Sequence, residues 1–165
     1  MFLISKLLTA NDQPGPLQNV IADDKIAVAG HADGGLTAAA AAYNSCCTDD
    51  RVQAVVGLAT ATALFPATWF TAPNGPAYLG IHGDKDETTP IDQGQALYAS
   101  APQPKYFVTL QGGDHRDPFT DGAEAPAVAR LMAEFLDAQL KKDPAGASGL
   151  ADDGNTPPFA LQSAS

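Results

Sequence analysis

The fold of this 165-residue chain is decided by residues 25–43, KIAVAGHADGGLTAAAAAY. Residues 26–29 form a compact apolar run that leads into a glycine, as is typical of a buried parallel strand. Residues 36–43 are rich in alanine, the strongest helix former. The glycines between the two segments predict a tight turn that leads directly from a strand into a helix.

The turn has the spacing of a nucleophile elbow. In the G-x-S-x-G motif, the nucleophile stands at the apex, and small residues two positions before and after it let the backbone pass. Gly30 and Gly34 supply the small residues, but Ala32 stands where the motif has serine. A methyl group cannot attack a carbonyl carbon, so this position carries no nucleophile.

Two loops downstream of the elbow carry, in this order, candidate acids and a histidine. Residues 81–90, IHGDKDETTP, contain candidate acids, and residues 112–119, GGDHRDPF, contain a histidine. Nucleophile, acid, histidine is the order found in α/β-hydrolases. The chain resembles that superfamily and, within it, the dienelactone-hydrolase and platelet-activating-factor-acetylhydrolase-like group, which includes cutinase-like polyesterases. The resemblance covers roughly residues 2–142 and implies carboxylic ester hydrolysis with no cofactor and no metal.

The resemblance assigns each catalytic role to a position. His115 corresponds to the histidine that moves protons, and Asp86 to the acid that orients it. The family acid comes three residues after the glycine of His-Gly, which favours Asp86 over Asp84. Ala32 takes the nucleophile position, and the backbone amide of Asp33 takes one half of the oxyanion hole.

An aspartate nucleophile is the alternative to a lost serine. Some α/β-hydrolases, haloalkane dehalogenases among them, attack with aspartate, and Asp33 adjoins the apex. With Asp33 at the apex, His31 would stand where the turn requires glycine. We therefore expect Asp33 to be a carboxylate at the helix start, and His31 and His82 to be packing residues.

Three aromatic residues follow the second predicted strand. Phe65, Trp69 and Phe70 fall on the side of the sheet where α/β folds bind ligands. They predict an aromatic wall for the acyl or alcohol group of an ester. A patch that covers the core is the equally consistent alternative.

The rest of the chain alternates strand and helix after a short amphipathic helix at the N-terminus. Apolar runs predict strands at residues 52–58, 77–81 and 106–110, and helical spacing predicts helices at residues 91–100 and 127–142. This order predicts an α/β fold with a parallel sheet of about four strands flanked by helices. We assign residues 1–142 to a partial α/β-hydrolase domain and residues 143–165, on composition, to a loop-rich or disordered tail.

Only one helix precedes the elbow, whereas the family elbow follows the fifth strand. The chain therefore resembles the C-terminal half of the fold, and the loop that supplies the second oxyanion amide is absent. We expect an esterase lineage that is inactive or severely impaired as written, whether a pseudoenzyme, a fragment or a serine-to-alanine variant. The alternative is a non-catalytic module that binds a small apolar ligand or assembles with itself through the exposed edge strand.

The net charge limits the kinds of partner that this chain can bind. A net charge of −10 with only nine Lys and Arg argues against binding to nucleic acid or an anionic membrane. No apolar run approaches the roughly 20 residues that span a bilayer, and the N-terminus makes a poor signal peptide. We expect a soluble protein and leave its compartment open.

Cys46 and Cys47 are adjacent, and we expect two buried apolar thiols rather than a strained bond or a metal site.

Overall fold

A computed structural model describes residues 2–61, 67–70, 74–120 and 122–164. Five strands form one sheet in the order β1-β2-β3-β4-β5; the first four are parallel, and β5 runs antiparallel to β4. This confirms the predicted α/β class, with one strand more than expected. The strands are β1 (Ile26–His31), β2 (Val52–Leu58), β3 (Ala77–Gly83), β4 (Lys105–Leu110) and β5 (Phe159–Ala164), and the helices are α1 (Phe2–Asn11), α2 (Asp33–Tyr43), α3 (Ile91–Ser100), α4 (Ala125–Leu140) and α5 (Pro144–Gly154).

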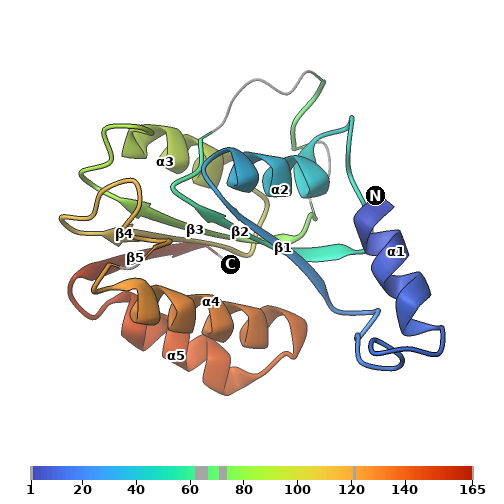
Figure 1. The fold of residues 1–165 in the computed structure, drawn as a ribbon. Helices are drawn as coiled ribbons and strands as arrows, with labels where there is room; N and C mark the ends of the chain where they lie inside the picture. Colours follow the sequence, from blue (N-terminus) through green and yellow to red (C-terminus); the bar gives the residue numbers. More distant parts are fainter. Residues whose placement is uncertain (1, 62–66, 71–73, 121, 165) are drawn as a thin grey trace.

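Helices cover both faces of the sheet. Helices α2 and α3 lie on one face and α4 and α5 on the other (Figure 1). The interior strand β2 contributes to both layers, since Val55 packs in the α2 and α3 layer, whereas Ala54 and Val56 pack in the α4 and α5 layer. Burial on both faces explains why the strands appear in the sequence as nearly continuous apolar runs.

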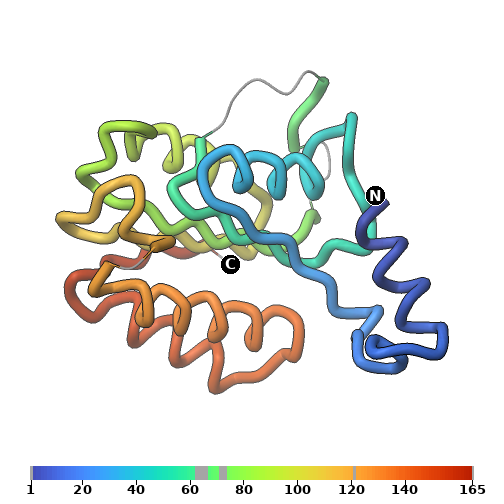
Figure 2. The backbone as a smooth tube through the Cα atoms, in the orientation of Figure 1, coloured from blue at the N-terminus to red at the C-terminus, as the bar shows by residue number. Residues whose placement is uncertain are grey.

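Strand β1 forms an edge of the sheet, as the sequence predicted. Its one partner among the described residues is β2. The chain reaches this edge from α1 through the loop that precedes Ile26 (Figure 2). Two large apolar side chains of α1 remain in solvent: Phe2 is 77% exposed and Leu3 is 68% exposed. The N-terminal region therefore leaves apolar side chains uncovered.

The prediction of a loop-rich or disordered tail is wrong for most of residues 143–165. Helix α5 begins with an aspartate cap, in which the side chain of Asp143 accepts a hydrogen bond from the amide of Ala145. Pro144 occupies the first turn, where its missing N–H costs nothing. Strand β5 then pairs with β4 along its length, from Phe159 opposite Leu110 onward.

The glycines of the tail are packing residues. A β-carbon at Gly146 would lie 2.7 Å from the carbonyl oxygen of Glu134 and 2.8 Å from the amide nitrogen of Ala138. Only a residue without a side chain lets α5 approach α4 this closely. The small residues that favoured disorder on composition are therefore what allows the two helices to pack.

Candidate active site

The strand-to-helix turn between β1 and α2 has a strained apex. Ala32 has φ 51° and ψ −120°, which lies outside the regions that non-glycine residues ordinarily adopt. Its amide donates to the carbonyl of Leu58 at 2.9 Å, and its carbonyl accepts from the amide of Leu36 at 3.0 Å. Such conformations cost about 1–3 kcal/mol and cluster at functional sites. The turn therefore has the strained strand-to-helix geometry expected of an elbow, with a methyl group at its apex.

The crowding around the turn differs in part from the sequence prediction. A β-carbon at Gly30 would lie 2.2 Å from the backbone carbon of Gly34, so Gly30 is required for the close approach. A β-carbon at Gly34 would meet nothing within 4 Å, whereas one at Gly35 would lie 1.8 Å from Oγ1 of Thr60. The second position that needs a small residue is thus Gly35 rather than Gly34.

The structure brings the predicted acid and the predicted histidine together. Nδ1 of His115 lies 2.8 Å from Oδ2 of Asp86. The side chain of Asp86 is fully buried, and its Oδ1 accepts the amides of Thr88 at 2.9 Å and Thr89 at 2.7 Å. A carboxylate only accepts hydrogen bonds, so Nδ1 carries the proton. In the neutral ring, Nε2 is then left as the base.

Asp86 is held in its charged form. Burial raises its pKa, but the backbone hydrogen bond from Thr89 and the hydrogen bond and charge of His115 outweigh burial, with a smaller contribution from His82. The net result is a pKa below the usual value for aspartate. The acid is therefore an anion at neutral pH, the state that orients a neighbouring imidazole and stabilises its cation.

His82 is a second histidine on the same carboxylate. Its buried Nε2 lies 2.8 Å from the carbonyl oxygen of Thr89 and 3.2 Å from Oδ2 of Asp86. Gly94 packs against its ring so closely that a β-carbon there would lie 2.4 Å from Nδ1. Asp84, the competing acid, instead accepts the amide of Gly112 at 2.7 Å. His82 and Asp84 thus brace the loops that carry Asp86 and the histidine.

His31 joins the elbow to the histidine loop, a role that sequence reasoning missed. Its Nε2 lies 2.8 Å from the carbonyl oxygen of His115, which accepts only, so Nε2 is the donor. The His31 ring lies 4.7 Å from the ring of His115 and stacks on Phe119 at 4.9 Å with an interplanar angle of 10°. The one signal in the sequence is that His31 directly precedes the apex. The contact places the histidine loop beside the residue next to Ala32.

An apolar pocket of about 250 Å³ lies next to this contact. It is formed by the end of β1, the histidine loop and α4. Its lining residues are Ala29, Gly30, His31, Leu58, Pro118, Phe119, Ala125, Val128, Ala129 and Met132. An engineered apolar cavity of about 150 Å³ binds benzene, so this pocket has room for a small apolar group.

The predicted aromatic wall is not at this site. Phe65 lies outside the described residues. The amide of Phe70 donates to the carbonyl of Tyr43 at 2.8 Å, and Trp69 pairs with Asn44 in an isolated bridge. These contacts put Trp69 and Phe70 at the far end of α2, roughly 15 Å along the helix from Asp33 at 1.5 Å per residue. The order of the elements in the sequence did not indicate that the segment after β2 returns to the C-terminal end of α2.

The expectation of two buried thiols is also wrong. Cys46 and Cys47 form a disulfide, with Cys46 exposed and Cys47 half-buried. The pair follows α2 in an exposed turn rather than on the apolar side of the helix. The small size of a thiol indicated a core position, but the end of the helix puts both residues at the surface.

No known protein-family model matches this sequence, and no curated protein matches it. In the part of the chain that the structure describes, none of the helices is both long and apolar enough to cross a membrane. Within the same residues, no cluster of three or more His, Cys, Asp or Glu side chains could hold a metal ion.

Proposed function

We propose that this chain carries the scaffold of an α/β-hydrolase-type carboxylic ester hydrolase, with Ala32 at the nucleophile position. The observation that carries the proposal is the combination of a strained strand-to-helix apex with a charged, buried Asp86 bound to Nδ1 of His115. His31 supports it, because this residue lies next to the apex and its side chain bonds the backbone carbonyl of His115.

The chemistry would require a hydroxyl at residue 32. Nε2 of His115 would take the hydroxyl proton while the oxygen attacks the ester carbonyl, and the alcohol would leave with that proton. The amide of Asp33, in the first turn of α2 where N–H groups lack intrahelical partners, would donate to the oxyanion. With alanine at the apex no acyl-enzyme forms, and loss of the triad serine lowers turnover by about 10⁶ in a well-studied hydrolase.

The test restores the missing atom. Ala32→Ser should hydrolyse a short activated ester such as p-nitrophenyl butyrate and should react covalently with a fluorophosphonate. The same variant carrying His115→Ala is the matched control and should lose both properties. An Ala32→Ser protein that folds, but neither hydrolyses the ester faster than the Ala32 chain nor takes the label, would refute the proposal.

A non-catalytic module is the second candidate, favoured by the open edge of β1 and the apolar pocket beside it. Edge strands with apolar side chains and no charge pair readily with another chain. The chain would then form oligomers and bind a small apolar molecule without ester turnover. Sedimentation of the chain at micromolar concentration tests this. Ala29→Lys, which places a charge on the exposed part of β1, should dissociate such oligomers, and a monomer at all concentrations would exclude self-assembly.

A further inference from the structure

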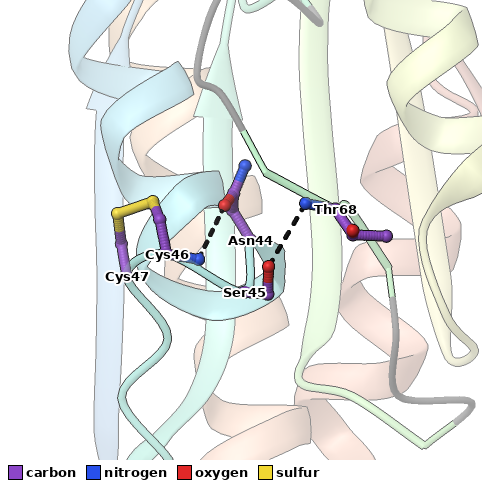
Figure 3. Close-up of a disulfide and its surroundings, with 5 residues drawn as sticks. All are labelled: Asn44, Ser45, Cys46, Cys47 and Thr68. Carbon is purple, nitrogen blue, oxygen red and sulfur yellow. Dashed lines mark hydrogen bonds between the residues drawn. A yellow bond between two sulfur atoms is a disulfide. The ribbon is translucent and has the colours of Figure 1, made fainter.

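The disulfide between Cys46 and Cys47 is open to chemical attack. It lies in the turn after α2 (Figure 3), where Cys46 is exposed and Cys47 half-buried. The Cα atoms of neighbouring residues are held 3.8 Å apart by the peptide bond between them. Most disulfides join Cα atoms about 4.4–6.8 Å apart, and bonds outside that range are more easily reduced. Exposure and spacing both favour exchange with a thiol.

Asn44 connects this turn to the end of the helix. The residue is fully buried, and its amide donates to the carbonyl of Ala40 at 3.1 Å. Its Oδ1 accepts the amide of Cys46 at 2.9 Å, and its backbone carbonyl accepts the amide of Cys47 at 2.9 Å. The backbone of both cysteines is therefore bonded to Asn44, the residue that caps the end of α2.

The same turn holds the segment 67–70. The amide of Ser45 donates to the carbonyl of Thr68 at 2.9 Å. Figure 3 shows a second bond, in which Oγ of Ser45 accepts the amide of Thr68 at 3.2 Å. The amide of Phe70 donates to the carbonyl of Tyr43 at 2.8 Å. Three hydrogen bonds thus join the segment to residues within three positions of the disulfide.

A second pocket, of about 460 Å³, lies at this end of α2. Tyr43 and Phe70 line it, and so do Thr48, Asp49 and Asp50, which directly follow the disulfide. Phe70 of the segment 67–70 and the residues after Cys47 thus line the same pocket, although neither cysteine does.

We propose that Cys46–Cys47 is a reversible thiol–disulfide exchange site that responds to dithiols and controls how the segment 67–70 is held on α2. One thiolate of the dithiol attacks Sγ of Cys46, the more exposed residue, and the bond to Cys47 breaks. The Cys47 thiolate takes a proton. The second thiol of the dithiol then attacks the mixed disulfide, loses its proton and releases Cys46 as a thiol. The dithiol is oxidised by two electrons to a disulfide, and the protein disulfide is reduced to two thiols. This inference is independent of the proposed ester chemistry.

The chain contains a built-in reporter for this change. Trp69 is its one tryptophan, it lies in the segment 67–70, and it forms an isolated bridge with Asn44. The oxidised protein should show no alkylation by iodoacetamide, and the protein treated with dithiothreitol should take up two alkyl groups. Reduction should change the Trp69 emission, and removal of the dithiol in air should restore it. The amides of Thr68 and Phe70 should exchange hydrogen about tenfold faster after reduction, because local opening becomes easier.

The double variant Cys46→Ser, Cys47→Ser is the matched control. It should behave like the reduced protein and should not respond to dithiothreitol. Hydrogen exchange separates loosening of the segment from a direct effect of the sulfurs on the tryptophan emission. Three results would overturn the proposal: alkylation without reductant, a bond that resists dithiothreitol in the folded protein, or reduction that leaves the exchange of Thr68 and Phe70 unchanged.

Discussion

The two ends of helix α2 are stabilised in opposite ways. At its start, Ala32 is fixed in a strained conformation by close backbone contacts, and its neighbour His31 donates to the backbone carbonyl of His115, which pairs with Asp86. At its end, a covalent bond between Cys46 and Cys47 closes an exposed turn. The start combines a strained backbone with a buried Asp–His pair but has only a methyl group at its apex, whereas the end carries a disulfide beside the buried Asn44. One helix thus has a strained, tightly packed turn at one end and a covalently cross-linked, exposed turn at the other.

The largest expected effect tests how rigidly the start of α2 is held. Gly30→Ala should destabilise the fold by about 3 kcal/mol or more, because the new β-carbon would overlap the backbone of Gly34. Gly34→Ala is the matched control, since its β-carbon points into open space. It should leave the free energy of unfolding unchanged or raise it by up to about 1 kcal/mol. Urea unfolding of both variants measures the difference, and equal losses would show that the turn is not crowded as described.

Asp86→Asn should cost about 1–3 kcal/mol at pH 7, because the charged acceptor of His115 and of two amides is lost. The pKa of Asp86 is lower in the folded chain than its usual value. Its contribution to stability is therefore complete above about pH 4, near the unfolded pKa, and is lost as the pH falls through the folded pKa. Thermal unfolding at several pH values should show the gap between the two proteins narrowing toward low pH. A gap that widens would contradict the assignment.

His31→Phe should loosen the histidine loop with a loss of about 0.5–1.5 kcal/mol. The ring can still stack on Phe119, but the donor to the carbonyl of His115 is gone. His31→Gln, which keeps an N–H donor, should recover part of the loss. In the Ala32→Ser background, the phenylalanine variant should lower kcat more than it raises KM, because its effect is on the position of the histidine. Unchanged hydrogen exchange in residues 113–119 would count against this role.

An effect of similar size on stability, but none on the histidine loop, is expected at the far end. Burial raises the pKa of Tyr43 well above its usual value, with a further contribution from Tyr78, so its hydroxyl stays a donor and bonds the carbonyl of Pro76 at 2.9 Å. Tyr43→Phe should cost about 1 kcal/mol and leave the NMR signals of the His115 ring unchanged. A shift of those signals would show that the two ends of α2 are coupled.

The sequence was most informative where patterns are local. The apolar run of β2 and the periodicity of α3 were predicted with the bounds that the structure has. The pairing of Asp86 with His115 followed from the order of the loops in a resembling family, although no known family matches the chain. The catalytic roles themselves stay predictions until residue 32 carries a hydroxyl.

Three of the misses share one physical origin. Gly146 suggested disorder on composition, but it is required by α4, which lies beside it only in the folded chain. Trp69 followed a strand in sequence, but its partner Asn44 lies at the other end of α2. The donor role of His31 depends on a carbonyl 84 positions away. Each of these contacts is long-range, and no local pattern specifies it.

The direction of β5 has a practical consequence. Ala164 lies opposite Lys105, the first residue of β4, while Phe159 lies opposite Leu110, the last. Ala164 therefore lies at the opposite end of the strands from the loops that carry Asp86 and His115. A tether attached beyond Ala164 would immobilise the protein with those loops turned toward the solution. A surface-bound Ala32→Ser chain should then stay as accessible to a substrate as the free protein.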